Sequence, residues 1–368
     1  MKNIVLIDDQ LLLALEISTD ENRKSKLYQQ LDLLCKNLDW NSGYTDKIIL
    51  HYNEVLPVVI LEHIHRYVRM QSTNIENIEL WTPLTFGVEE WYKKWCELYC
   101  EKGFKIVEKD SDYRCWNLWI ENKINFDVDK VFEEKANSLQ YLFTYWGGSY
   151  SLIDRDLLYL NMLNFDDHAL IDYQGKVKDL KKVLDYAEET SYFVDQPFVE
   201  NIEKNFYKKT KPVNQRINQN VDYAFNELFD CKGIQWHCDK LALGSVIRET
   251  INTEPYIHST EKTWRCFYHL CIPFPISYRS VEHLQKLGFQ FPHDVIDYSY
   301  CDIPLFKDRI IELNRVLTDV LQKSKQHGYS KIYKQCKPSI VHNYKQLDKI
   351  KPDSITFAGK IWKYDKQR

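Results

Sequence analysis

The chain has 368 residues, of which 44% are hydrophobic and 28% are charged, and its formal net charge is −4. This length favours two domains of roughly 150–200 residues each. No stretch approaches the roughly 18 uninterrupted apolar residues of a membrane helix, and Asp8, Asp9 and Gln10 interrupt the first apolar run where a signal peptide stays apolar, so we expect a soluble, cytoplasmic protein.

The charges are unevenly distributed along the chain. Residues 322–368 hold 12 Lys or Arg and 3 Asp or Glu, a local charge of +9, which leaves the first 321 residues at 37 minus 50, or −13. A basic tail of this kind can contact phosphate, and a solvated helix face explains the same pattern.

The ten cysteines are scattered without a CxxC pair, which is typical of reduced thiols in a core. Cys231, His237 and Cys238 lie close together in the sequence but lack the second pair of ligands that a zinc site requires. We therefore expect no bound metal.

Strand and helix patterns alternate along the first 109 residues. Short apolar runs typical of buried strands are followed by segments with apolar residues at helical spacing. We predict strands at 3–8, 47–52, 77–83 and 104–109, and helices at 25–38, 58–70 and 88–103. No glycine-rich phosphate loop of the GxGxxG or Walker type follows any of these strands.

The same alternation begins again after the polar stretch 110–137. We predict strands within 139–150, 168–173, 241–250 and 272–277, helices at 152–164, 260–271, 281–288 and 306–328, and helical character over 176–230. The expected fold class is α/β, with two Rossmann-like parallel-sheet domains (1–135 and 136–368), a long closing helix and a basic carboxyl-terminal tail. Because open parallel sheets bind ligands at the carboxyl ends of their strands, we expect the ligand in the cleft between the domains.

One charged segment, "STEKTWR" (259–265), stands out between two apolar strand patterns. Thr260 can cap a helix whose first turn carries Glu261 and Lys262, with Arg265 one turn further on. Free N–H groups and two cations then come together, which favours the binding of an anion. A capped surface helix with a charged face is the alternative explanation.

Further motifs surround this segment. A strand pattern ends in Arg248 and Glu249 ahead of "TEK" (260–262), Pro273 lies in the strand pattern that follows, and the block "YLFTYWGGSYSLIDRDLLYLNML" places Arg155 early in a predicted helix. Together these motifs resemble those of α-1,3-fucosyltransferases and of phage-encoded glycosyltransferase-like proteins. The resemblance covers most of residues 139–315.

The resemblance implies a glycosyltransferase of the GT-B type. Such an enzyme would move a sugar from a nucleoside-diphosphate sugar to an acceptor hydroxyl, with inversion and without a metal or other cofactor. In that family the TEK glutamate faces the donor sugar, the lysine faces the diphosphate and an upstream arginine faces the phosphates, which by position are Glu261, Lys262 and Arg155. Cations beside a helix amino terminus stabilise the departing diphosphate. The other expected donor-site residues are Thr260, Arg265, Glu249 and Arg248.

The acceptor hydroxyl needs a base, which we expect from the amino-terminal domain. Glu54, after the strand at 47–52, and Asp8, after the first strand, are the candidates, although a carboxylate at either place is also a common loop residue. The acceptor stays open between two classes. A hydroxymethylated base in phage DNA could be held by the basic tail, and a glycan suits the 25 Tyr and 10 Trp.

The sequence departs from the family pattern and leaves alternatives. Ser277 follows the proline strand where the family has a glycine, and residues 176–240 form a longer spacer than fucosyltransferases have, so a catalytically silent protein that binds a nucleotide or sugar is the alternative function. A metal-dependent transferase with a DxD site is a further alternative. "DSD" (110–112), "DVD" (127–129) and "DRD" (154–156) fit formally, but "DRD" lies within a predicted helix, where its carboxylates diverge.

Overall fold

The computed structural model describes most of the chain. The described residues are 3–7, 28–29, 32, 48–52, 58–71, 75–83, 85–109, 126–147, 152–173, 175–192, 196–208, 234–249, 257–259, 261–349, 356–357 and 360–361. The chain divides into two compact units. The first unit comprises Met1–Asn117, Thr253–Thr260 and Lys351–Arg368, and the second comprises Leu118–Asn252 and Glu261–Ile350. The division predicted at residue 135 falls inside a helix of the second unit, α6 (Val128–Ser138).

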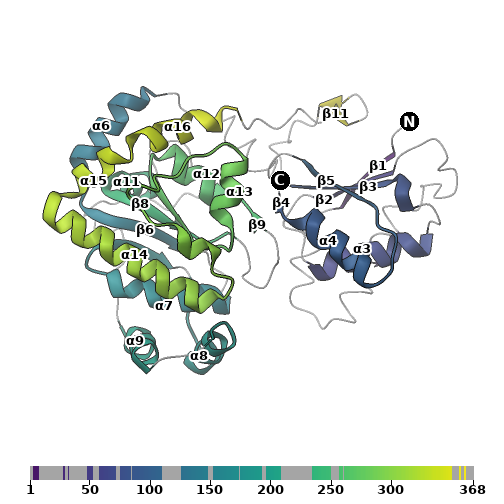
Figure 1. Ribbon diagram of the computed structural model, residues 1–368, viewed down its shortest axis with the longest axis horizontal. Helices are drawn as coiled ribbons and strands as arrows, with labels where there is room; N and C mark the ends of the chain where they lie inside the picture. The colour runs from purple at the N-terminus through teal and green to yellow at the C-terminus, as the bar shows by residue number, and fades with distance from the viewer. Residues whose placement is uncertain are drawn as a thin grey trace. The chain divides into compact units, whose positions relative to one another are not determined.

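The first unit contains a parallel sheet of four strands in the order β1-β2-β3-β5 (Figure 1). Its strands are β1 (Asn3–Ile7), β2 (Ile48–Tyr52), β3 (Ile78–Pro83) and β5 (Lys105–Lys109). Two α-helices with described side chains accompany them, α3 (Val58–Gln71) and α4 (Val88–Leu98), with a short 3-10 helix η1 (Ile75–Asn77) before β3. The four predicted strands are thereby confirmed. The helix predicted at 25–38 lies almost wholly outside the described residues.

A hydrogen-bonded histidine holds the core of the first unit together. His65 on α3 is buried, and its Nδ1 lies 2.6 Å from the hydroxyl of Tyr92 on α4. The same hydroxyl accepts the backbone N–H of Phe104, just ahead of β5, at 3.3 Å. Because a buried polar group is costly unless it is paired, this contact sets how α3, α4 and β5 pack.

A second, small ladder returns a distant segment to the first unit. β4 (Thr85–Phe86) pairs in antiparallel fashion with β9 (Ile257–His258). The chain therefore leaves the second unit after β8, contributes β9 to the first unit and re-enters the second unit at Glu261. Two-residue strands carry too little periodicity to be read from sequence, and neither was predicted.

The second unit contains a parallel sheet in the order β10-β8-β6-β7. Its strands are β6 (Tyr141–Gly147), β7 (Ala169–Tyr173), β8 (Ala242–Ile247) and β10 (Ile272–Pro275), and each confirms a predicted strand. From β6 the chain first adds β7 on one side and then crosses to β8 and β10 on the other. The strand order thus reverses between β6 and β8, and in open sheets this is where ligands bind.

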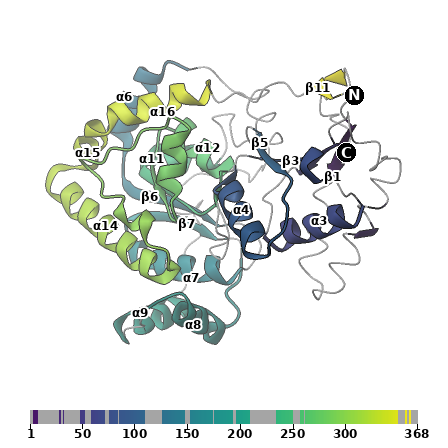
Figure 2. The same cartoon turned by 45° about the vertical axis from the view of Figure 1, so that its right-hand side comes forward.

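Helices surround this sheet (Figures 1 and 2). Besides α6 they are α7 (Ile153–Met162), α8 (Leu180–Glu189), α9 (Gln196–Phe206), α11 (Ile234–Leu241), α12 (Glu261–Tyr268), α13 (Ser280–Lys286), α14 (Phe306–His327), α15 (Tyr329–Gln335) and α16 (Lys337–Leu347). Short 3-10 helices follow α7 and precede α14, η2 (Leu163–Phe165) and η4 (Ser299–Asp302). α8 and α9 pack against each other and against α7. The described helices include none that is long and apolar enough to cross a membrane.

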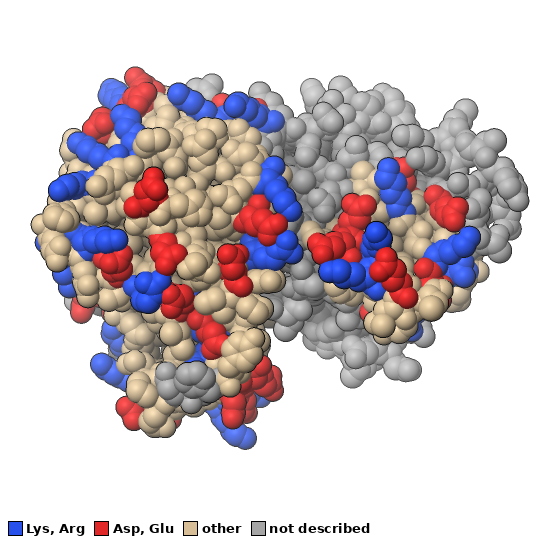
Figure 3. Space-filling view, in the orientation of Figure 1, with Lys and Arg blue, Asp and Glu red and all other residues tan. Residues whose placement is uncertain are grey.

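The carboxyl-terminal region was expected to be a basic tail, but up to Leu347 it is folded into helices. The predicted long helix is α14, but it does not close the fold, because α15 and α16 follow it. α16 packs against α12 and α6 through buried residues that include Ile340, Tyr344 and Leu347. Lys334 and Lys337 of this region form ion pairs with Glu133 of α6. Acidic and basic side chains lie interspersed over the face of the second unit in Figure 3, which matches the solvated helix face rather than a free polybasic arm.

We predict that the first unit loses stability in mild acid through His65. Burial lowers the pKa of His65, although Glu101 opposes this, so the unfolded chain takes up the proton first. Stability is therefore complete above a pH of about 6.5, the pKa of an unperturbed histidine, and falls as the pH drops toward the lower folded-state pKa. Urea titrations between pH 7.5 and pH 5, followed by the fluorescence of nearby Trp95, would measure this.

The matched variant is His65→Gln, which keeps a partner for Tyr92 but does not titrate. It should show a smaller loss of stability between the two pH values than the wild type. An identical loss in both proteins would assign the acid sensitivity to other groups.

Candidate functional site

The candidate site lies in the second unit, where β6 and β8 end. After β6 the chain enters α7, whose first turn carries Asp154, Arg155 and Asp156. After β8 it continues directly into Arg248 and Glu249. The strand order reverses between these two strands, so their carboxyl ends bring the two charged segments to one edge of the sheet.

A buried ion pair joins the two segments. The Nε of Arg248 donates to Oδ2 of Asp154 at 2.6 Å, and its Nη2 contacts the same oxygen. Both side chains are about 4% exposed. In this low-dielectric setting, removing one partner costs far more than the net gain from forming the pair. The pair therefore fixes the amino terminus of α7 against the end of β8.

Arg155 stands beside this pair without a partner of its own. Among the residues that the structure describes, it forms no hydrogen bond and no ion pair. Burial lowers the pKa of its guanidinium and the neighbouring Arg248 lowers it further, while the Asp154 carboxylate opposes part of this shift. The carboxylate of Asp156, one residue on, accepts a hydrogen bond from the Tyr173 hydroxyl. A largely buried cation without a counter-ion is unfavourable, and an anionic ligand would relieve it.

Tyr145 on β6 is a second buried group in this site that could still form a hydrogen bond. Its side chain is 2% exposed, and its hydroxyl has no hydrogen-bond partner. Burial raises the pKa of Tyr145, and the cation of Arg248 acts against that rise, which places the phenol within electrostatic range of the ion pair. A neutral O–H donor and the Arg155 guanidinium are groups that an anion can accept from.

The amino terminus of α7 adds to this positive environment. No side chain caps it, since Leu152 occupies the N-cap position. Its first-turn N–H groups carry the positive end of the helix dipole beside Arg155. The free cation, the unpaired phenol and the uncapped helix start together suit one negatively charged group.

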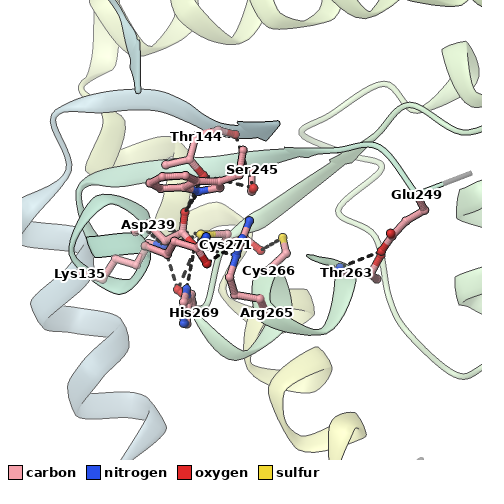
Figure 4. Close-up of polar contacts among 12 residues, drawn as sticks. Lys135, Thr144, Asp239, Ser245, Glu249, Thr263, Arg265, Cys266, His269 and Cys271 are labelled. Atoms are coloured by element: carbon pink, nitrogen blue, oxygen red, sulfur yellow. Dashed lines mark hydrogen bonds and ion pairs between the residues drawn. The ribbon is translucent and has the colours of Figure 1, made fainter. Parts of the chain in front are cut away.

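The side chain of Glu249, which follows β8, contacts Thr263 in the first turn of α12, as Figure 4 shows. Its Oε1 accepts the backbone N–H of Thr263 at 3.0 Å and also the Thr263 hydroxyl, and its Oε2 lies 3.9 Å from Nζ of Lys262. The Glu249 N–H donates to the hydroxyl of Ser277 at 3.4 Å. Glu249 is thus the anion at this helix terminus, and Lys262, with a side chain 27% exposed, is the cation beside it.

Arg265 lies elsewhere, in a buried network around Asp239 (Figure 4). Its Nε is 3.3 Å from Oδ2 of Asp239, and its Nη1 donates to Gln235 at 3.0 Å. Asp239 also accepts from Thr144 at 2.6 Å and lies 2.7 Å from Nδ1 of His269. Arg265 and Asp239 are both buried. The structure therefore separates Arg265 from Arg155, Arg248, Glu249 and Lys262, with which the sequence had grouped it.

The charge state of Asp239 follows from these contacts. Although burial raises its pKa, the cation of Arg265 and the hydrogen bond with His269 hold that pKa well below the usual range of a carboxyl. Burial lowers the pKa of His269 despite the adjacent carboxylate. Asp239 is accordingly ionised and held by donors on three sides, which is the pattern of a structural ion network.

Four predicted site residues have no described side chain. Glu54, Asp8 and Thr260 lie outside the described residues. For Glu261 the structure describes only its place as the first residue of α12. In the DxD motifs, Asp127 caps α6 and the carboxylates of "DRD" diverge to Arg248 and Tyr173, while 110–112 is outside the described part. Within the described residues no group of three or more His, Cys, Asp or Glu could hold a metal ion.

Sequence reasoning missed two members of the site. Tyr145 lies in an apolar strand, where a tyrosine looks like any other core residue, and Asp154 was considered only as part of "DRD". In the structure Thr144 pairs with Ser245 and Tyr145 pairs with Val246, so both residues of β6 lie next to β8. Only the register of the two strands shows this neighbourhood. The alternation of strand side chains would have indicated that Thr144 and Tyr145 face opposite sides.

Comparison with known proteins found no matching family model, no matching curated protein and no matching solved structure. The site is therefore interpreted from its own residues and geometry.

We predict opposite effects on stability for the two arginines of the site. Arg248→Met takes the guanidinium away from the buried carboxylate of Asp154 and should cost about 3–5 kcal/mol in the free energy of unfolding. Arg155→Met removes a cation that has no partner among the described residues, so stability should stay unchanged or rise. Chemical denaturation of both variants measures the difference. A large loss for Arg155→Met would show that this cation has a structural partner.

We also predict that Lys135 on α6 is essential to the Asp239 network. Its buried Nζ donates to the backbone carbonyls of Asp239 at 2.6 Å and His269 at 2.9 Å, and to Sγ of Cys271 at 3.0 Å. Lys135→Met would leave these acceptors without a donor and should cost about 2–3 kcal/mol of stability.

The control for this variant is Lys130→Met, at an exposed position on the same helix, which should change stability by less than about 0.5 kcal/mol. Equal denaturation midpoints for the two variants would contradict the assignment.

Proposed function

We propose that the protein is a glycosyltransferase that uses a nucleoside-diphosphate sugar and no metal ion, with the diphosphate bound at the Arg155 site. The observation that carries this proposal is the largely buried Arg155, which has no counter-ion among the described residues and stands where the strand order of the second sheet reverses. Diphosphate is an anion of matching charge, and arginine binds its oxygens in a bidentate manner.

The roles of the other residues follow from their contacts. Arg248 is tied to Asp154, so it would position α7 and add positive potential rather than bind the ligand directly. Lys262 lies in the first turn of α12, 3.9 Å from Glu249, and by the resemblance in sequence it would face the leaving diphosphate. By the resemblance in sequence, Glu261 would face the donor sugar. Negative charge that develops on the departing diphosphate would then be stabilised by Arg155, Lys262 and the start of α7.

The two α/β units with parallel sheets are what a GT-B architecture requires of its halves, and this supports the proposal. Glu54 and Asp8 remain the proposed bases for the acceptor hydroxyl, either of which would come from the first unit. The acceptor remains proposed as a hydroxymethylated base in DNA or a glycan. Ser277 favours the second candidate function, a catalytically silent binding protein, because its buried hydroxyl stands at the family's glycine position and is bonded to the N–H of Glu249.

We predict that a nucleoside diphosphate raises the melting temperature of the protein and that Arg155→Gln removes this effect. A panel of UDP, GDP and dTDP and their sugars, in the presence of EDTA, would identify the donor by thermal shift and by slow release of free sugar. Loss of a charge-assisted contact costs about 1.5–3 kcal/mol, so the variant should bind roughly 10- to 150-fold more weakly.

Lys262→Ala should reduce sugar release more than it reduces nucleotide binding, because the leaving group gains charge only during the reaction. The matched control is Lys181→Ala, an exposed lysine on α8, which should behave as the wild type. Binding without any sugar release or transfer would support the silent binding protein. If no nucleotide binds, the proposed function is wrong in both forms.

A further inference from the structure

A separate cavity of about 620 Å³ lies in the second unit, between α13 and the segment that leads into α14. Its volume is within the range of about 300–1,000 Å³ that is typical of small-molecule sites. It is lined by Val281, Glu282, Gln285, His293, Ile296, Asp297, Tyr298, Ser299 and Asp302. None of these residues belongs to the Arg155 site.

The charged groups in the wall of this cavity are carboxylates. Glu282 comes from α13, Asp297 from the loop between α13 and η4, and Asp302 from η4. The described residues that line the cavity include no lysine or arginine. Hydrogen bonds from Arg279 lower the pKa of Glu282, and the backbone N–H of Ser299 lowers that of Asp297, so both groups are ionised at neutral pH. Arg279, Lys286 and Arg315 offset the charge of these two carboxylates from outside the wall, so among the described residues the uncompensated negative charge of the wall comes from Asp302.

Asp302 differs from the other two carboxylates. Glu282 pairs with Arg279 and Lys286, and Asp297 pairs with Arg315. Asp302 is exposed and forms no side-chain hydrogen bond or ion pair with any residue that the structure describes. It is therefore the carboxylate of this wall that has no partner among the described residues and can pair with a ligand.

Neutral polar groups and apolar surface complete the wall. His293 and Gln285 lie on the rim, with their Nε2 atoms 3.1 Å apart, and each keeps a further polar atom for a ligand. The hydroxyl of Ser299 is a donor and an acceptor. The buried ring of Tyr298 contributes apolar surface, and its hydroxyl has no hydrogen-bond partner.

We propose that this cavity binds a small polyhydroxylated molecule that is neutral or carries an ammonium group, such as a sugar or an amino sugar. Hydroxyl groups both donate and accept hydrogen bonds, which matches a wall of carboxylates, amide, imidazole and hydroxyl. The C–H faces of a sugar ring match the apolar surface formed by Val281, Ile296 and Tyr298. An ammonium group would pair with Asp302. This binding does not depend on the proposed transferase activity.

The test uses the full chain with glucose, glucosamine and glucuronate as probes of equal size and different charge. Saturation-transfer NMR and calorimetry should rank glucosamine first, glucose second and glucuronate last. Asp302→Asn should weaken the binding of glucosamine about 3- to 10-fold while changing glucose less, because the ion pair is lost and the hydrogen-bonding shape is kept. Asp294→Asn, at an exposed carboxylate next to the cavity but outside its lining, should leave all three affinities unchanged.

A second variant tests the cavity by blocking its volume rather than by changing its charge. Gln285 is exposed on α13, so Gln285→Trp can fill the cavity without disturbing the core and should abolish binding of all the sugars. The proposal is overturned if none of the sugars binds, if glucuronate binds as well as glucosamine, or if Gln285→Trp binds as the wild type does. Nucleotide-induced shifts in melting temperature should be the same in these variants as in the wild type, which separates this site from the Arg155 site.

Discussion

The second unit depends on one buried carboxylate, Asp239. Its side chain receives hydrogen bonds or ion pairs from β6, from Arg265 of α12 and from His269 just after that helix, and its backbone carbonyl receives Lys135 of α6. A charge that is fully removed from water is tolerated only when donors satisfy it completely. Because every partner must be in place at once, α6, α11, α12 and the sheet can pack in one arrangement.

This arrangement determines where the candidate site stands. Arg265 anchors one side of α12 in the core, so the first turn of the same helix presents Lys262 and Thr263 to Glu249 at the end of β8. Arg248, the preceding residue, holds α7 through Asp154. The end of β8 is thus fixed to the start of α7 by a buried ion pair and to the start of α12 by the hydrogen bonds of Glu249, and Arg155 is left without a counter-ion among the described residues.

The two sites proposed for the second unit differ in the sign of their charge. The Arg155 site combines a guanidinium that has no partner among the described residues with an uncapped helix start, whereas the described residues that line the cavity beside α13 include carboxylates and no lysine or arginine. We therefore propose different ligands for them, an anion for the first and a neutral or ammonium-bearing polyol for the second. The order of the strands explains why only the first lies at the ligand position expected for a parallel sheet.

The sequence by itself determined the α/β class, the eight strands of the two parallel sheets and helices α3, α4, α7, α12, α13 and α14, because strand and helix periodicities are local, whereas α6, α11, α15 and α16 were not predicted. It also indicated Arg248, Glu249 and Lys262, which follow a strand or open a helix, and it indicated Arg155 through the resemblance in sequence. Only the tertiary structure showed that Arg265 forms an ion pair with Asp239, that Arg248 is paired with Asp154 and that Arg155 lacks a counter-ion among the described residues. These outcomes depend on which charges meet across distances of 26 to 94 residues along the chain, and no local pattern encodes such pairings.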